Sequence, residues 1–165
     1  MIFYTANPTG ALGAALDRFR RAAHPYASAA HVTVAGPLTN PDRRLEEPFN
    51  DRVGVGLRGA GMWAQADGRF TVYVPVTSRK LSAVRNTPLY PDGPLHLTLY
   101  NGPDRTLAMR VFEIASNPPL DGAFYVEGLT MRDKTLNATV PDRCADPREL
   151  PALWAEVIKA LGGAE

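Results

Sequence analysis

The sequence HVTV at residues 31–34 recurs as HLTL at residues 96–99. Successive side chains of a β-strand point to opposite faces, so each His-x-Thr-x segment places a histidine and a threonine on one face and two aliphatic residues on the other. Gly-Pro follows both segments, at residues 36–37 and 102–103, and ends each strand pattern. The two segments therefore predict matching strands, each with one polar face and one face suited to a hydrophobic core.

The elements around these segments are predicted in the same order in both halves of the chain. Each half has a strand, then a helix, then the His-x-Thr-x strand, and a Pro-Asp-Arg stretch after it. The predicted elements are Ile2–Ala6, Ala11–Ala23 and His31–Val34 in the first half, and Phe70–Val76, Ser78–Asn86 and His96–Leu99 in the second. This order indicates a single duplication, with pseudo-repeats at about residues 1–66 and 67–140, rather than a repeat array.

The remaining segments complete an α+β pattern. We expect a short helix within Asn40–Asp51, an irregular strand over Val53–Trp63, a helix over Arg105–Ser116, strands over Ala123–Arg132 and Thr135–Val140, and a C-terminal helix at about residues 147–162. The chain therefore predicts one two-lobed domain over residues 1–165, with helices on the outside of its sheets.

Composition narrows the functional classes. The formal net charge of +1 lacks the basic excess of a protein that binds double-stranded DNA. The single cysteine, Cys144, excludes a disulfide within the chain and a cysteine-based zinc site. No segment approaches 18 uninterrupted apolar residues, so no membrane span is expected. We expect a cytoplasmic monomer without a metal or other cofactor.

The paired motifs point to acid–base chemistry. If a pseudo-twofold axis relates the halves, His31 and Thr33 face His96 and Thr98 across a cleft. Breaking a phosphate ester needs a base for the nucleophile and an acid for the leaving oxygen, and two imidazoles supply both near neutral pH. The threonine hydroxyls can donate to the phosphoryl oxygens in the transition state. The sequence therefore predicts a metal-independent phosphoesterase with two catalytic histidines.

The doubled motif resembles the two-histidine (2H) phosphoesterase superfamily, which includes 2′-5′ RNA ligase-like proteins and 2′,3′-cyclic nucleotide phosphodiesterases. The element order matches over Met1 to about Val140, whereas only the two motifs match residue by residue. The resemblance implies a bilobed α+β fold, with two antiparallel sheets around a central cleft. It also implies catalysis by His31 and His96 and phosphate contacts by Thr33 and Thr98.

The resemblance further implies a nucleotide substrate with a cyclic or 2′-linked phosphodiester, such as an RNA end that carries a 2′,3′-cyclic phosphate. Two alternatives to hydrolysis stay open. The first is transesterification that leaves a cyclic product, as in a nuclease acting on RNA ends or on cyclic dinucleotides. The second is a nucleotide-binding module without turnover. The motifs do not show which histidine is the acid and which is the base.

Tyr100 is a further candidate for substrate binding. It lies four residues after His96, so a continuing regular strand would place it on the catalytic face. An aromatic ring at that position can stack on a nucleobase. If Tyr100 instead only supports the strand, base recognition is expected near Trp63 and the loop Pro88–Pro94.

Overall fold

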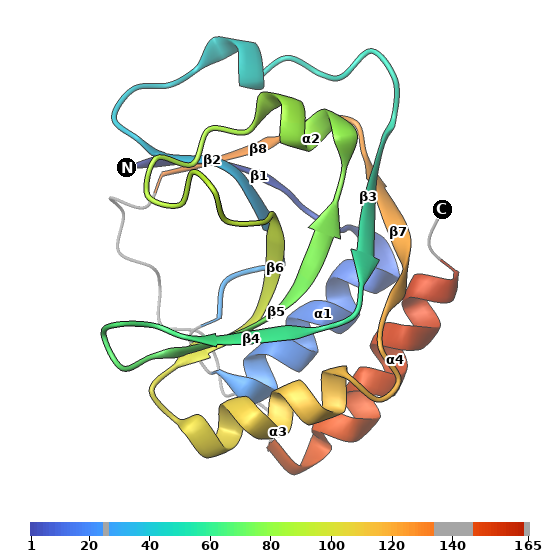
Figure 1. Ribbon diagram of the computed structural model, residues 1–165. Coiled ribbons are helices and arrows are strands. Elements are labelled where there is room, and N and C mark those ends of the chain that lie inside the picture. Colours follow the sequence, from blue (N-terminus) through green and yellow to red (C-terminus); the bar gives the residue numbers. More distant parts are fainter. Residues whose placement is uncertain (25–26, 134–146, 164–165) are drawn as a thin grey trace.

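The computed structural model describes residues 1–24, 27–133 and 147–163, and it confirms the α+β class (Figure 1). The strands are β1 (Ile2–Ala6), β2 (Val32–Leu38), β3 (Val53–Arg58), β4 (Gly61–Ala64), β5 (Phe70–Thr77), β6 (His96–Gly102), β7 (Asp121–Val126) and β8 (Thr130–Asp133). The helices are α1 (Gly10–Ala23), α2 (Arg79–Val84), α3 (Arg105–Ala115) and α4 (Leu150–Gly162), with 3-10 turns η1 (Arg43–Leu45) and η2 (Pro147–Glu149). No helix in the described ranges is long and apolar enough to cross a membrane.

The strands form one curled sheet in the order β7-β3-β5-β6-β2-β1-β8, and β4 adds to β5. The two motif strands, β2 and β6, are antiparallel neighbours at its centre, joined by the pair Val32 and Leu97. The expectation of two separate sheets is wrong in this respect, because this pair connects the strands of the first half to those of the second. On either side of the junction the order repeats, with β1 beside β2 and β5 beside β6.

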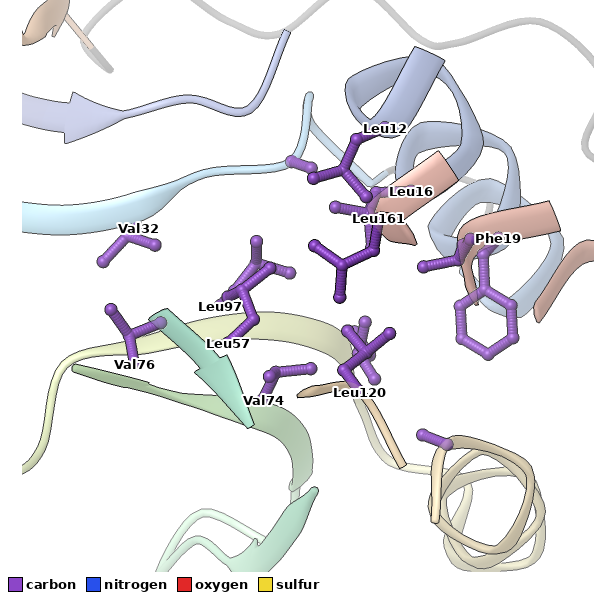
Figure 2. Close-up of a cluster of buried hydrophobic side chains, with 14 of the residues drawn as sticks. Leu12, Leu16, Phe19, Val32, Leu57, Val74, Val76, Leu97, Leu120 and Leu161 are labelled. Atoms are coloured by element: carbon purple, nitrogen blue, oxygen red, sulfur yellow. The ribbon is translucent and has the colours of Figure 1, made fainter. Parts of the chain in front are cut away.

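The larger core lies on one face of this sheet, against α1, α3 and α4 (Figure 1). Helix α2 lies apart from them and packs near β2, where Tyr4, Ala35 and Leu45 form a second, smaller buried cluster. Figure 2 shows aliphatic side chains from β2, β3, β5 and β6 meeting those of α1 and α4. The labelled members of this buried cluster are Leu12, Leu16, Phe19, Val32, Leu57, Val74, Val76, Leu97, Leu120 and Leu161. The helices predicted over Ala11–Ala23 and at about residues 147–162 are confirmed as α1 and α4, and each buries one face in this core, where Phe19 packs on Trp154 with ring centroids 5.0 Å apart.

Two predicted strands are each divided in the structure. The segment Val53–Trp63 forms β3 and β4, and the chain turns between them at Gly59, whose φ of 78° favours glycine. The segment Ala123–Arg132 forms β7, which pairs with β3, and β8, which pairs with β1 at the far end of the sheet. The predicted strand Thr135–Val140 lies outside the described residues. The short helix expected within Asn40–Asp51 is the 3-10 turn η1.

The two Pro-Asp-Arg stretches have the same structural role. Asp42 precedes η1 and Asp104 precedes α3, and each aspartate side chain accepts a hydrogen bond from a backbone N–H of the turn that it starts. The backbone N–H of Asp42 donates to the hydroxyl of buried Tyr4 at 2.9 Å, and that of Asp104 donates to the hydroxyl of buried Tyr100 at 3.1 Å. The two Pro-Asp-Arg stretches are therefore anchored by matching tyrosine contacts.

Replacing Leu97 by alanine should lower the free energy of unfolding by about 2–5 kcal/mol, because this fully buried side chain would leave a cavity at the junction of the halves. The matched control is Leu89→Ala, which removes the same atoms from a residue that is 65% exposed and should change stability by less than about 0.5 kcal/mol. Urea denaturation measures both values. Equal losses in the two variants would contradict the central position of Leu97.

Candidate active site

The pairing of Val32 with Leu97 decides where the motif residues point. In an antiparallel pair, the residues that flank a bridged pair lie opposite one another across the strands. Continuing this register by one residue in each direction would put His31, which lies just before β2, across from Thr98, and Thr33 across from His96. The four motif residues are His31, Thr33, His96 and Thr98, and all four are partly exposed.

Val32 and Leu97 are fully buried in the core, and their sequence neighbours point to the opposite face of the sheet. All four motif residues therefore project from one patch of the face that the core does not cover. Residues directly opposite in such a pair have Cβ atoms about 4.5–5.5 Å apart, which is within reach of one small anion. The two motifs thus lie on neighbouring strands of one sheet, and their facing each other across a cleft stays a prediction.

Both histidine rings have the same backbone partner. Nδ1 of His31 lies 2.7 Å from the carbonyl oxygen of Ala29, and Nδ1 of His96 lies 3.1 Å from that of Pro94. A carbonyl oxygen only accepts hydrogen bonds, so Nδ1 carries the proton and donates in each ring. This fixes the tautomer and leaves Nε2 as the atom that can gain or lose a proton.

Arg132, on the edge strand β8, brings a positive charge to His31. Its Nη1 lies 3.4 Å from Nδ1 of His31. Because that nitrogen already donates to Ala29, the guanidinium is not its hydrogen-bond donor and instead acts as a neighbouring charge. The sequence did not single out Arg132, because β7 and β8 were expected as one strand and the pairing of β8 with β1 was not foreseen.

His96 has aromatic neighbours instead. Its ring centroid lies 5.2 Å from that of Trp63 on β4 and 5.7 Å from that of Tyr73 on β5, and both contacts are edge-to-face. Burial lowers the pKa of His96 below its usual value, and the positive charge of Arg85 acts in the same direction, although the hydrogen bond to Pro94 opposes them. The surroundings of His96 therefore favour the neutral ring, which is the form that accepts a proton.

The prediction that Tyr100 shares the face of His96 is wrong. The register pairs Tyr73 with Thr98 but Val72 with Tyr100, so Leu99 is an extra residue that forms a β-bulge. The bulge shifts the alternation of side chains, and both Leu99 and Tyr100 point into the core. Because Tyr100 is only 3% exposed, its ring is not open to a nucleobase.

A matching bulge occurs in the first motif strand. Thr5 pairs with Thr33 and Tyr4 pairs with Ala35, which leaves Val34 as the extra residue. In each motif strand, the alternation of side chains between the two faces of the sheet therefore shifts at the fourth residue of His-x-Thr-x. This change confines the polar face to the histidine and the threonine of each motif, since the following residues, Ala35 and Tyr100, are both buried.

Two further features lie elsewhere in the fold. A hollow of about 370 Å³ lies between α3 and α4, and its lining includes Ile114 and Trp154 but none of the four motif residues. In the described part of the chain, no group of three or more histidine, cysteine, aspartate or glutamate side chains is arranged to hold a metal ion.

Comparison of the chain with protein-family models, curated proteins and solved structures found no match.

The pKa of His96 can be measured by following its ring signals in NMR spectra across a pH series, and the midpoint should lie below 6.5. Trp63→Ala should move the midpoint back towards 6.5, because water would reach the ring more easily. The unfolded chain binds this proton more readily, so stability should decline as pH falls through about 6.5 and stop declining below the folded pKa. A midpoint at or above 6.5 in the native protein would contradict this environment.

Tyr100→Phe should lower the free energy of unfolding by about 0.5–1.5 kcal/mol, because the N–H of Asp104 would lose its acceptor. Tyr4→Phe is the matched variant in the other half and should have a similar cost, through the N–H of Asp42. Thermal or urea denaturation gives both values. If Tyr100→Phe left stability unchanged, its assignment as a structural residue would be wrong.

Proposed function

We propose that this protein is a metal-independent phosphodiesterase of the two-histidine (2H) phosphoesterase type. Its substrate is a nucleotide with a cyclic or 2′-linked phosphodiester, such as an RNA end that carries a 2′,3′-cyclic phosphate. The observation that carries the proposal is the pair Val32–Leu97, since its register directs two histidines and two threonines to the same face of the sheet, opposite the larger core.

The chemistry follows from the two rings. A water molecule attacks phosphorus, and its proton passes to Nε2 of one histidine, while the bond from phosphorus to the ribose oxygen breaks and the other histidine protonates that oxygen. The burial of His96 among aromatic rings favours its neutral form, so we assign the base to His96. This leaves the acid to His31, whose protonated ring is disfavoured by the charge of Arg132 and favoured by the negative charge of the bound phosphate.

The remaining polar groups stabilise charge. The hydroxyls of Thr33 and Thr98 donate to the non-bridging phosphoryl oxygens, on which negative charge develops during attack. Arg132, beside His31, attracts the anionic phosphate to the site, and none of its described contacts is an ion pair with an acidic side chain. Both Nδ1 atoms are held by backbone carbonyls, so the rings keep their orientation as protons move at Nε2.

A substrate panel with and without EDTA tests this proposal. The panel contains 2′,3′-cyclic nucleotides, a 2′-5′-linked dinucleotide and RNA with a 2′,3′-cyclic phosphate end. Turnover should persist in EDTA, and the products should be nucleoside monophosphates or opened phosphate ends. Loss of turnover in EDTA would contradict the metal-free mechanism. A cyclic product from linear RNA would instead indicate transesterification, and binding without turnover on every substrate would indicate a nucleotide-binding module.

His31→Ala and His96→Ala should each lower kcat by about 10²–10⁴-fold, as expected for the loss of a general acid or base. Thr33→Ala and Thr98→Ala should cost about 1–3 kcal/mol of transition-state stabilisation. The matched control is His24→Ala, because His24 ends α1 and should leave kcat per folded molecule unchanged. Full activity in either motif-histidine variant would show that the corresponding motif is not catalytic.

A further inference from the structure

The contact between the two motif strands is narrow. Only the pair Val32–Leu97 joins β2 to β6 in the described sheet. Further along, β2 turns to the segment after α2: the N–H of Gly36 donates to the carbonyl of Asn86 at 2.8 Å, and the N–H of Asn86 donates to the carbonyl of Val34 at 3.0 Å. One pair of residues is a weak constraint on the spacing of two catalytic groups, so other contacts must contribute.

Arg20, on α1, provides such a contact from the core side of the sheet. Its side chain is 5% exposed. Nε donates to the carbonyl oxygen of Thr98 at 2.7 Å, and Nη1 donates to the carbonyl oxygen of Ser28. Thr98 belongs to the second motif, and Ser28 lies three residues before the histidine of the first. One guanidinium thus binds the backbone of the second motif and of the loop that leads into the first.

The loop before β2 has a second attachment to the same helix. The carboxylate of Asp17, one turn before Arg20, accepts a hydrogen bond from the N–H of Ala30 at 2.7 Å. Between these two anchored residues lies Ala29, whose carbonyl holds Nδ1 of His31. The orientation of His31 therefore depends on a loop that α1 fixes on both sides.

The charge on Arg20 strengthens these bonds. Burial lowers the pKa of Arg20 to about 10, and the nearby carboxylate of Asp17 opposes this effect. The guanidinium therefore stays protonated at neutral pH. Hydrogen bonds from a charged donor are shorter and stronger than those between neutral groups, and the planar fork of arginine can bind two acceptors at a set separation.

We propose that Arg20 is a positioning residue for the two-histidine site, which sets the separation of the two motifs by binding the Thr98 and Ser28 carbonyls together. The catalytic consequence rests on the proposed function. The two hydrogen bonds from Arg20 to the carbonyls of Thr98 and Ser28, called the clamp below, are a property of the fold. Lysine keeps the charge but lacks the fork, so Arg20→Lys separates the two contributions. The matched control is Arg21→Lys, at the adjacent exposed position of α1.

The first readout does not require a substrate. Hydrogen exchange of the backbone amides at residues 31–33 and 96–98 should be at least about tenfold faster in Arg20→Lys, whereas amides of the β3–β7 ladder should keep their protection. Arg21→Lys should match the wild type at every amide. A uniform acceleration over the whole core would mean that Arg20 only adds global stability, and unchanged exchange would mean that it does not hold the junction; either result overturns the proposal.

The second readout is catalysis with 2′,3′-cyclic AMP. Arg20→Lys should lower kcat by at least about tenfold and change KM by less than about threefold, because misplacing the two rings affects the transition state more than binding. A kcat equal to that of the wild type would overturn the positioning role. So would a loss of activity that is fully explained by a smaller fraction of folded protein. If the wild type showed no turnover while the local exchange effect persisted, the proposed function would fail and the clamp would stand.

If Arg20→Lys does not fold, Asp17→Ala tests the same loop through a partly exposed residue. It should speed exchange at residues 29–31 and lower kcat, with KM again nearly unchanged. Unchanged exchange and unchanged kcat in that variant would show that the attachment of the loop to α1 does not position His31.

Discussion

The buried pair of Val32 and Leu97 is the contact on which the rest of this structure depends. It joins the two halves of the chain into one sheet, and its register sets the positions of the motif residues. Since both aliphatic side chains face the core, the histidine and threonine beside each of them must face outwards. A shift of one residue would turn the polar groups into the core, so core packing and site geometry share one constraint.

The two motif strands have similar backbone features, but the side chains around their histidines differ. Both motif strands carry a bulge at the fourth motif residue, and both histidines donate through Nδ1 to the carbonyl two residues earlier. The neighbours differ, since His96 lies against Trp63 and Tyr73 whereas His31 lies beside Arg132. We infer that the two motifs supply two similar rings and that the burial of His96 among its aromatic neighbours makes it the base in the proposed reaction.

Strand alternation and helical periodicity predicted the positions of the helices and the shared face of each histidine with its threonine. They did not predict that Tyr100 is buried, because no glycine or proline marks the bulge at Leu99. They also missed Tyr73 and Arg20 as neighbours of the motifs, since these contacts join segments far apart in the chain. Pairing between distant strands is a tertiary property that local patterns do not encode.

The pH dependence of kcat/KM with a 2′,3′-cyclic nucleotide tests the central claim most directly, because it reports the essential acid and base of the free enzyme. With one neutral and one protonated histidine, the profile should be bell-shaped, and its acidic limb should have a midpoint below pH 6.5, where His96 gains its proton. A rate that is independent of pH between about 5 and 8, the range in which imidazole titrates, would contradict two-histidine catalysis.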